Sequence, residues 1–227
     1  MISILKLQII SLFIVTSYSC DNKNSGNNNL QEKMEKEYQK KTEVRFANVD
    51  TKPALNSRIG AFDALIRFSE IQQASSAGLN FEFEIHYKGD VSCSISNPIY
   101  YLLYLIKCNG KYLSTISKAP IPLVNRRGSI DFNEDFNFDF VKVSRNDIAV
   151  DIKEEVNSPI IHFKKNEYIN YSLQIPKVIN PITKELMAMQ PDLYELEFTF
   201  SLIDTTNSID DRQFRTLKAN NIAIKLE

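Results

Sequence analysis

The feature that most constrains this chain is a strict alternation of apolar and polar residues. Residues 81–87 read Phe-Glu-Phe-Glu-Ile-His-Tyr, and residues 130–143, 169–175 and 194–202 alternate in the same way. Successive side chains of a β-strand point to opposite faces, so a period of two gathers the apolar side chains on one face. Strands that each bury a single face predict an antiparallel β fold.

Shorter segments and turn signals complete this pattern. Residues 99–108 are almost continuously apolar and are predicted to form a central strand. Asn109-Gly110 then predicts a tight turn, because both residues adopt a positive φ at low cost. We expect short strands at 91–96, 147–151 and 160–164. A last strand at 217–226 would carry a bulge at Asn220-Asn221, and residues 183–189 are predicted to form a short helix.

The order of these features from Gly78 onward resembles immunoglobulin-like domains of bacterial surface lipoproteins. The shared elements are the Asn97-Pro98 turn, the turn at residues 109–111, the strand at residues 165–173 and the closing hairpin. The resemblance implies an immunoglobulin-like antiparallel β-sandwich over residues 77–227. It bears on architecture alone, because the chain has no Trp and so lacks the Cys–Trp–Cys spacing of antibody domains.

The segment before this domain, residues 51–76, is expected to be a helical lead-in. Apolar residues recur at spacings of three and four, which favours an amphipathic helix within residues 57–74. They are Ile59, Phe62, Leu65 and Ile66. A strand through Ala64, Ile66 and Phe68 is the alternative.

The first twenty residues have the order of a signal peptide. Lys6 is their only charge, residues 7–15 are almost wholly apolar, and small or polar residues at Thr16, Ser17 and Ser19 precede Cys20. The apolar run is shorter than the roughly 20 residues that span a bilayer. This segment resembles a bacterial lipoprotein signal peptide, which implies that residues 1–19 are removed and that the new N-terminal Cys20 carries lipid. Secretion without lipid is the alternative.

The resemblance implies a protein anchored to a membrane of the bacterial cell envelope, with the outer membrane or the cell surface as the expected location. Residues 20–50 would form the tether, because their Asn-rich beginning has no apolar side chain to bury. Cys93 and Cys108 remain as an even pair in an exported protein, which is compatible with a disulfide. Two separate thiols are the alternative.

Motifs for catalysis or metal binding are not found in the sequence. Asp131, Asn133 and Asp135 match the first ligands of a calcium loop, but Phe136 stands where such a loop needs Gly. His86 and His162 have no second ligand at zinc spacing, and no nucleophile elbow or phosphate loop is present. The 27 basic and 28 acidic side chains leave no positive excess for nucleic acid. We expect no cofactor, no metal and no enzyme activity.

The sequence therefore favours a non-catalytic binding or structural module of the envelope, with a protein partner. Its candidate contact residues are in loops: Ile121, Leu123, Arg126 and Arg127 in one, and Met187 and Met189 in another. Packing of these side chains against the domain's own ends is the alternative for each loop. An anchored immunity protein that neutralises an exported toxin, and an envelope hydrolase, are the other functions that the sequence allows.

Overall fold

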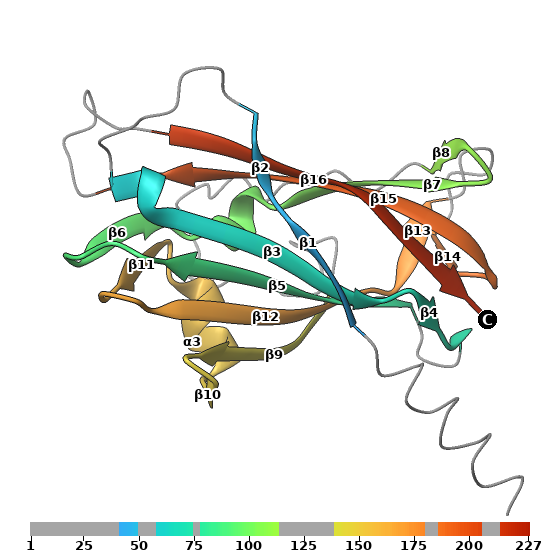
Figure 1. Cartoon of the computed structure of the whole chain (residues 1–227). Helices are drawn as coiled ribbons and strands as arrows, with labels where there is room; N and C mark the ends of the chain where they lie inside the picture. The colour runs from blue at the N-terminus through green and yellow to red at the C-terminus, as the bar shows by residue number, and fades with distance from the viewer. Residues whose placement is uncertain (1–40, 50–57, 75–77, 114–138, 180–185, 206–213) are drawn as a thin grey trace, which may run out of the picture. The chain divides into compact units, whose positions relative to one another are not determined.

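The structure is a computed structural model that describes residues 41–49, 58–74, 78–113, 139–179, 186–205 and 214–227 (Figure 1). All of them belong to one compact unit, Lys36–Glu227. The predicted signal peptide, Cys20 and the tether before residue 41 lie outside these ranges. No helix within them is long and apolar enough to cross a membrane.

The larger part of the fold is two six-stranded sheets (Figure 1). The first sheet is antiparallel, in the order β1 (Lys41–Arg45), β3 (Phe62–Ser69), β5 (Leu79–Tyr87), β12 (Tyr168–Ile175), β9 (Asp139–Arg145) and β10 (Ile148–Ala149). The second has the order β2 (Ala47–Asn48), β16 (Phe214–Leu226), β15 (Asp192–Ile203), β7 (Leu103–Cys108) and β8 (Lys111–Leu113), with β4 (Ile71–Gln72) parallel to β16.

Two small ribbons and three short helical segments complete the described part. One ribbon pairs β6 (Cys93–Ser96) with β11 (Ile160–Phe163), and the other pairs β13 (Lys177–Ile179) with β14 (Leu186–Ala188). The α-helix is α3 (Ile152–Asn157), and the 3₁₀ segments are η1 (Arg58–Ala61) and η3 (Pro98–Tyr101). The expected all-β class is thus confirmed.

Aromatic side chains from both sheets meet in one core. The ring centroids of Phe81 and Phe198 are 4.8 Å apart, and those of Phe83 and Phe200 are 5.1 Å apart. Phe46, between β1 and β2, contacts Phe83 and Phe200 at 5.6 and 4.9 Å. The three pairs among Phe46, Phe83 and Phe200 are edge-to-face, an arrangement that adds to the free energy of burial. The alternation that predicted β5, β12 and β15 therefore identified the inward faces of these strands correctly.

The predicted turn and bulge are both present. Asn109 and Gly110 have φ values of 51° and 71°, and they join β7 to β8. In the β15–β16 pair, Leu196 faces Ile222 while Phe198 faces Ala219, so β16 carries one extra residue between these two positions. Asn221 there has a φ of 61°. Both features rest on the tolerance of Asn and Gly for positive φ.

The predicted helix within residues 57–74 is wrong, and the alternative strand is correct. Arg58–Ala61 form a 3₁₀ turn, and β3 follows it with β1 and β5 on its two edges. Leu65 is also buried, at 7% exposure, so residues 64–66 are buried in succession. This run produced the mixed spacing of apolar residues that suggested a helix. The β fold therefore includes β1 to β4, although we predicted that a tether extended to residue 50 and that the domain began at residue 77.

Two further sequence predictions need correction. Residues 99–108 begin as η3 rather than as a strand, and β7 lies next to the edge strand β8 rather than in the centre of its sheet. Its apolar run reflects a burial pattern in which Tyr104 and Ile106 face inward while Leu103 and Leu105 are exposed. Residues 186–188 form β14, which contradicts a helix there. The helix α3 was not predicted.

Candidate functional site

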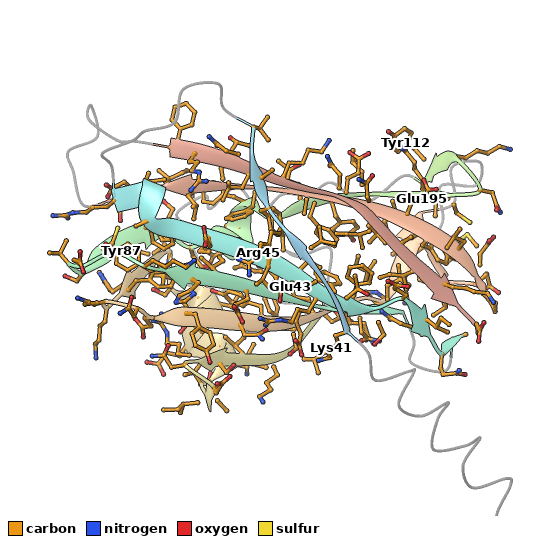
Figure 2. All side chains as sticks on the ribbon, in the orientation of Figure 1. Lys41, Glu43, Arg45, Tyr87, Tyr112 and Glu195 are labelled. Atoms are coloured by element: carbon orange, nitrogen blue, oxygen red, sulfur yellow. The ribbon has the colours of Figure 1, made fainter. Side chains whose placement is uncertain are left out.

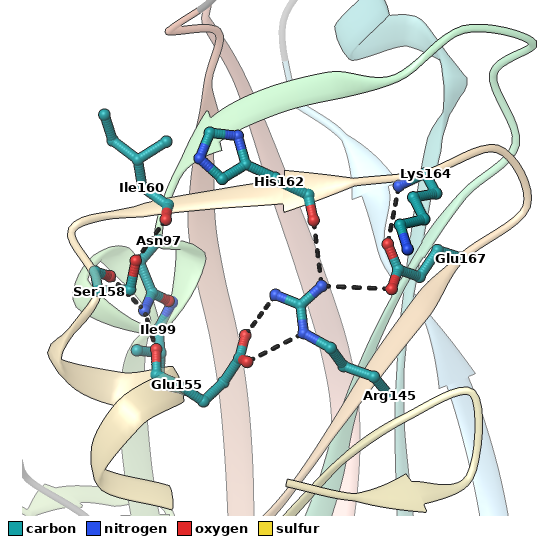
Figure 3. A network of polar contacts seen from close by, with 9 residues as sticks. All are labelled: Asn97, Ile99, Arg145, Glu155, Ser158, Ile160, His162, Lys164 and Glu167. Atoms are coloured by element: carbon teal, nitrogen blue, oxygen red, sulfur yellow. Dashed lines mark hydrogen bonds and ion pairs between the residues drawn. The ribbon is translucent and has the colours of Figure 1, made fainter. Parts of the chain in front are cut away.

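The densest polar cluster is centred on Arg145, at the end of β9 (Figure 3). Its guanidinium donates to both carboxylate oxygens of Glu155, with Nη2–Oε1 at 2.7 Å and Nε–Oε2 at 2.9 Å. Nη1 donates to the backbone oxygen of His162 at 3.0 Å and to Glu167 Oε1 at 3.4 Å. The fork geometry of Arg suits this bidentate pairing. One cation thus serves two carboxylates.

The surrounding backbone holds these two glutamates in place. Glu155 lies on α3, whose first turn is capped by Asp151 through a 3.0 Å bond from the Glu154 backbone N–H. The other oxygen of Glu167, Oε2, accepts from the Lys164 backbone N–H at 2.7 Å. Buried Asn97 donates to the backbone oxygens of Glu155 and Ser158 at 3.0 and 2.9 Å. The cluster therefore ties α3 to the first sheet and to the turn after β11.

Each charged side chain of this cluster has an ion-pair partner within it. The side chains of Arg145, Glu155 and Glu167 are 23%, 10% and 11% exposed. Burial alone would lower the pKa of Arg145, but the hydrogen bonds and negative charge of Glu155, with the charge of Glu167, outweigh it and raise the pKa. Two carboxylates close together would suit acid–base chemistry. Here a single guanidinium is hydrogen-bonded to both carboxylates, so the cluster is suited to holding α3 in position.

A serine and a histidine meet on the β6–β11 ribbon. Ser94 Oγ and His162 Nδ1 are 2.7 Å apart, and the two residues lie directly opposite each other in the strand register. A nucleophilic serine also needs hydrogen-bond donors placed for the oxyanion. The backbone oxygens of both residues accept from outside the ribbon, Ser94 from the Thr205 N–H and His162 from Arg145, each at 3.0 Å. The geometry is that of a cross-strand pair on an exposed face.

Cys93 and Cys108 are not joined by a disulfide in this structure. Cys93 is buried in β6, and Cys108 ends β7 and donates to Asp192 Oδ2 at 3.1 Å. Burial, followed by this hydrogen bond and the charge of Asp192, raises the pKa of Cys108 to about 11. A thiol with this pKa is a poor nucleophile at neutral pH.

The outer face of the second sheet carries exposed apolar side chains, among them that of Tyr112 (Figure 2). Leu103 and Leu105 of β7 are 42% and 49% exposed, Tyr112 of β8 is 57% exposed, and Leu193 of β15 is 48% exposed. Leu105 and Tyr112 line a pocket of about 310 Å³, together with Lys107, Glu195, Glu197, Asn221 and Ala223. We call this pocket the Tyr112 pocket. Clusters of exposed apolar side chains are a mark of interaction surfaces.

The two glutamates of the Tyr112 pocket differ in their ion pairs. Glu197 accepts from Lys218 at 2.8 Å and lies 3.6 Å from Lys107, and the contact with Lys218 is the main cause of its lowered pKa. The ammonium of Lys107 also lies 4.7 Å from the centroid of the Tyr112 ring. Among the ion pairs of the described residues, none includes Glu195, which is exposed. The pocket therefore has an aromatic wall, an aliphatic wall and an unpaired carboxylate.

A larger pocket of about 440 Å³ lies at one end of the first sheet. Its charged side chains are already paired: Lys41 with Glu82 at 2.6 Å, and Arg67 with Glu84 at 2.7 Å. The side-chain amide of Gln72, another lining residue, bonds to both backbone groups of Asn80. These groups are used in holding β1, β3, β4 and β5 together. We therefore regard the smaller Tyr112 pocket as the better candidate for a functional site.

The predicted contact residues are only partly placed. Cys20, Ile121, Leu123, Arg126 and Arg127 lie outside the described residues, as do the residues of the rejected calcium loop. Met187 is 36% exposed on β14, as expected for a contact residue. Met189 is 6% exposed and packs into the core, which contradicts its assignment to a binding surface. The sequence prediction missed Leu105, Tyr112 and Glu195, because it treated the strand containing Leu105 as buried on both faces.

Comparisons with known proteins give no further guide. No protein-family model matches the chain, and the searches of curated proteins and of solved structures found no match. What can be said of its function rests on the sequence and the geometry above.

Proposed function

We propose that this chain is an exported lipoprotein of the bacterial cell envelope, anchored through Cys20, which acts as a non-catalytic binding module for a protein partner. The observation that carries the binding role is the exposed apolar outer face of the second sheet: Leu103, Leu105, Tyr112 and Leu193. On the opposite sheet, Lys41 pairs with Glu82 and Arg67 pairs with Glu43 and Glu84, while the exposed apolar residues Val141 and Ile148 lie on its β9 and β10. Exposed apolar side chains gain most from being covered by a partner.

Anchoring is supported by the sequence. An apolar run that follows Lys6 and ends in Ser19-Cys20 has the order of a lipoprotein signal peptide. Several acyl chains on one cysteine would bind a membrane stably, since each buried CH₂ contributes about 0.8 kcal/mol. A protein held in this way acts by contact with molecules that reach the same surface.

The immunoglobulin-like β-sandwich belongs to the same proposal, and two observations favour it. The strand orders β3-β5-β12-β9 and β16-β15-β7-β8 correspond to the A-B-E-D and G-F-C-C′ orders of immunoglobulin sheets. In addition, Tyr194, near the start of β15, donates its hydroxyl to the backbone oxygen of Gln190 at 2.8 Å. A tyrosine corner of this kind occurs at the same place in immunoglobulin-like domains.

The anchoring part is tested by expressing the full chain and its Cys20→Ala variant in bacteria grown with labelled palmitate. We expect label and membrane association for the native chain, and neither for the variant. Equal membrane association of both proteins, with no label in either, would refute anchoring through Cys20.

The binding part is tested by placing a photo-crosslinking amino acid at Leu105 and, as a matched control, at Lys142 on the outer face of the first sheet. We expect a defined protein adduct in whole envelopes from position 105 only. Identical patterns from both positions would refute this surface as the binding surface. An exported toxin as the adduct would identify the module as an immunity protein.

A further inference from the structure

We infer that the Tyr112 pocket binds an extended segment of a protein partner in which a lysine or arginine is flanked by apolar residues. This inference rests on the proposed binding function and specifies the chemistry of the partner.

The strand register shows which residues of the pocket are cross-strand neighbours. Lys107 of β7 lies opposite Tyr112 of β8 on one side and opposite Glu195 of β15 on the other, and Glu195 in turn faces Ala223 of β16. Ala223 is small and lies close to the bulge at Asn221, so its side chain leaves room in the pocket beside Glu195. Leu105 lies two residues before Lys107 on the same face. The result is a depression with an acidic group in its floor and apolar side chains beside it.

Charge determines which side chain fits this depression. Glu197 is paired with Lys218 and Lys107, whereas Glu195 has no ion pair within the described residues. Its carboxylate does act on Lys107, whose pKa is raised first by the side-chain hydrogen bond with Tyr112 and then by Glu197 and Glu195. Because Lys107 and Lys218 offset the charge of Glu197, Glu195 is the acidic group of the pocket that a partner cation would meet.

The ring of Tyr112 already contacts a cation. The ammonium of Lys107 lies 4.7 Å from the ring centroid, which is within the range of a cation–π contact. Tyr112 is 57% exposed, so a partner can reach its side chain. A partner lysine or arginine could lay its alkyl chain on Tyr112 and Leu105 with its charge at Glu195. The apolar residues on either side of it would cover Leu103 and Leu193.

The test is a selection of random nine-residue peptides, displayed on phage, against the mature chain and its variants. We expect selected peptides to contain a lysine or arginine with apolar neighbours. Affinity of a synthetic selected peptide should fall roughly three- to fivefold for Glu195→Gln, as for an exposed ion pair. Tyr112→Ala should lower it about tenfold or more, as for an aromatic anchor. A selection against Glu195→Lys should yield acidic peptides instead.

The matched control is Glu154→Gln, which removes an exposed carboxylate on α3 and should leave peptide affinity unchanged. Selected peptides without a basic residue, or with affinities indifferent to residue 195, would overturn the inference. So would a selection that yields no peptide above background. These results leave the binding module intact if the crosslink at Leu105 still forms, whereas loss of that crosslink would count against the proposed function itself.

Discussion

Replacing Arg145 with Met is the most informative test of how this fold is held together. The substitution keeps an unbranched apolar stem and removes the cation that serves Glu155 and Glu167. Both carboxylates are about 10% exposed, so water cannot replace the lost partner fully. Breaking a buried ion pair by removing one partner costs about 3–5 kcal/mol. We expect the free energy of unfolding at pH 7 to fall by about that amount.

The pH dependence of this loss distinguishes charge from packing. In the variant, two carboxylates are buried without a cation, and the native state favours their neutral form more than the unfolded state does. The native variant then binds more protons than the unfolded chain, so its stability rises, relative to the native sequence, as the pH falls. The deficit measured at pH 7 should therefore shrink at pH 5.

Urea denaturation of the mature chain, followed by circular dichroism at both pH values, measures this difference. Arg145→Lys is the matched control, because it keeps the charge but loses the two-pronged contact with Glu155. It should show a smaller deficit with little dependence on pH. Two results would refute the role assigned to this cluster. One is a loss of unfolding free energy for Arg145→Met below about 1 kcal/mol, which is typical of an exposed pair. The other is a loss of equal size at pH 5 and pH 7.

Three further predictions concern single groups. Tyr171→Phe should leave the melting temperature unchanged or raise it, because the buried Tyr171 hydroxyl has no hydrogen-bond partner among the described residues. Tyr100→Phe should lower the free energy of unfolding by about 1–3 kcal/mol, because it removes the hydroxyl that donates to the Val156 carbonyl. A larger loss of stability for Tyr171→Phe than for Tyr100→Phe would contradict this. Gly78→Ala should destabilise the fold by well over 1 kcal/mol in urea titrations. The Cβ of the new alanine would lie 2.2 Å from the Ile175 backbone oxygen, and the φ of residue 78 is 153°. A loss of stability near zero would contradict that geometry. Iodoacetamide should modify the Cys108 thiol slowly at pH 8, because the pKa of this thiol is about 11. The rate should rise in the Asp192→Asn variant, and equal rates in the two proteins would contradict the role of Asp192.

The sequence predicted those elements whose two faces differ clearly in polarity. β5, β12 and β15 alternate strictly, and the structure buries the predicted residues on each. The turn at Asn109-Gly110 and the bulge at Asn221 followed from the low cost of positive φ at these residues. These features depend on local chemistry, which is readable along the chain.

The sequence misled where burial depends on distant segments. Leu65 is buried although it lies on the outward side of β3, and the resulting run of buried residues imitates a helical period. The Arg145 cluster joins β9, α3 and the turn between β11 and β12, and no local pattern indicates such a meeting. Likewise, the 99–108 run gave no sign that Leu103 and Leu105 face outward, because apolar residues occupy both faces of β7.

On the outer face of the second sheet, partner binding and the stability of the domain can be tested separately. If Leu105 and Tyr112 serve a partner, then exposing polar atoms there should not harm the isolated domain. The double variant Leu105→Thr and Tyr112→Thr keeps residues that favour strands. Its free energy of unfolding should stay within about 0.5 kcal/mol of the native value for each substitution, while crosslinking to the partner is lost. A loss above about 2 kcal/mol in urea titrations would mean that these side chains pack against the domain itself, and the surface would then have no need of a partner.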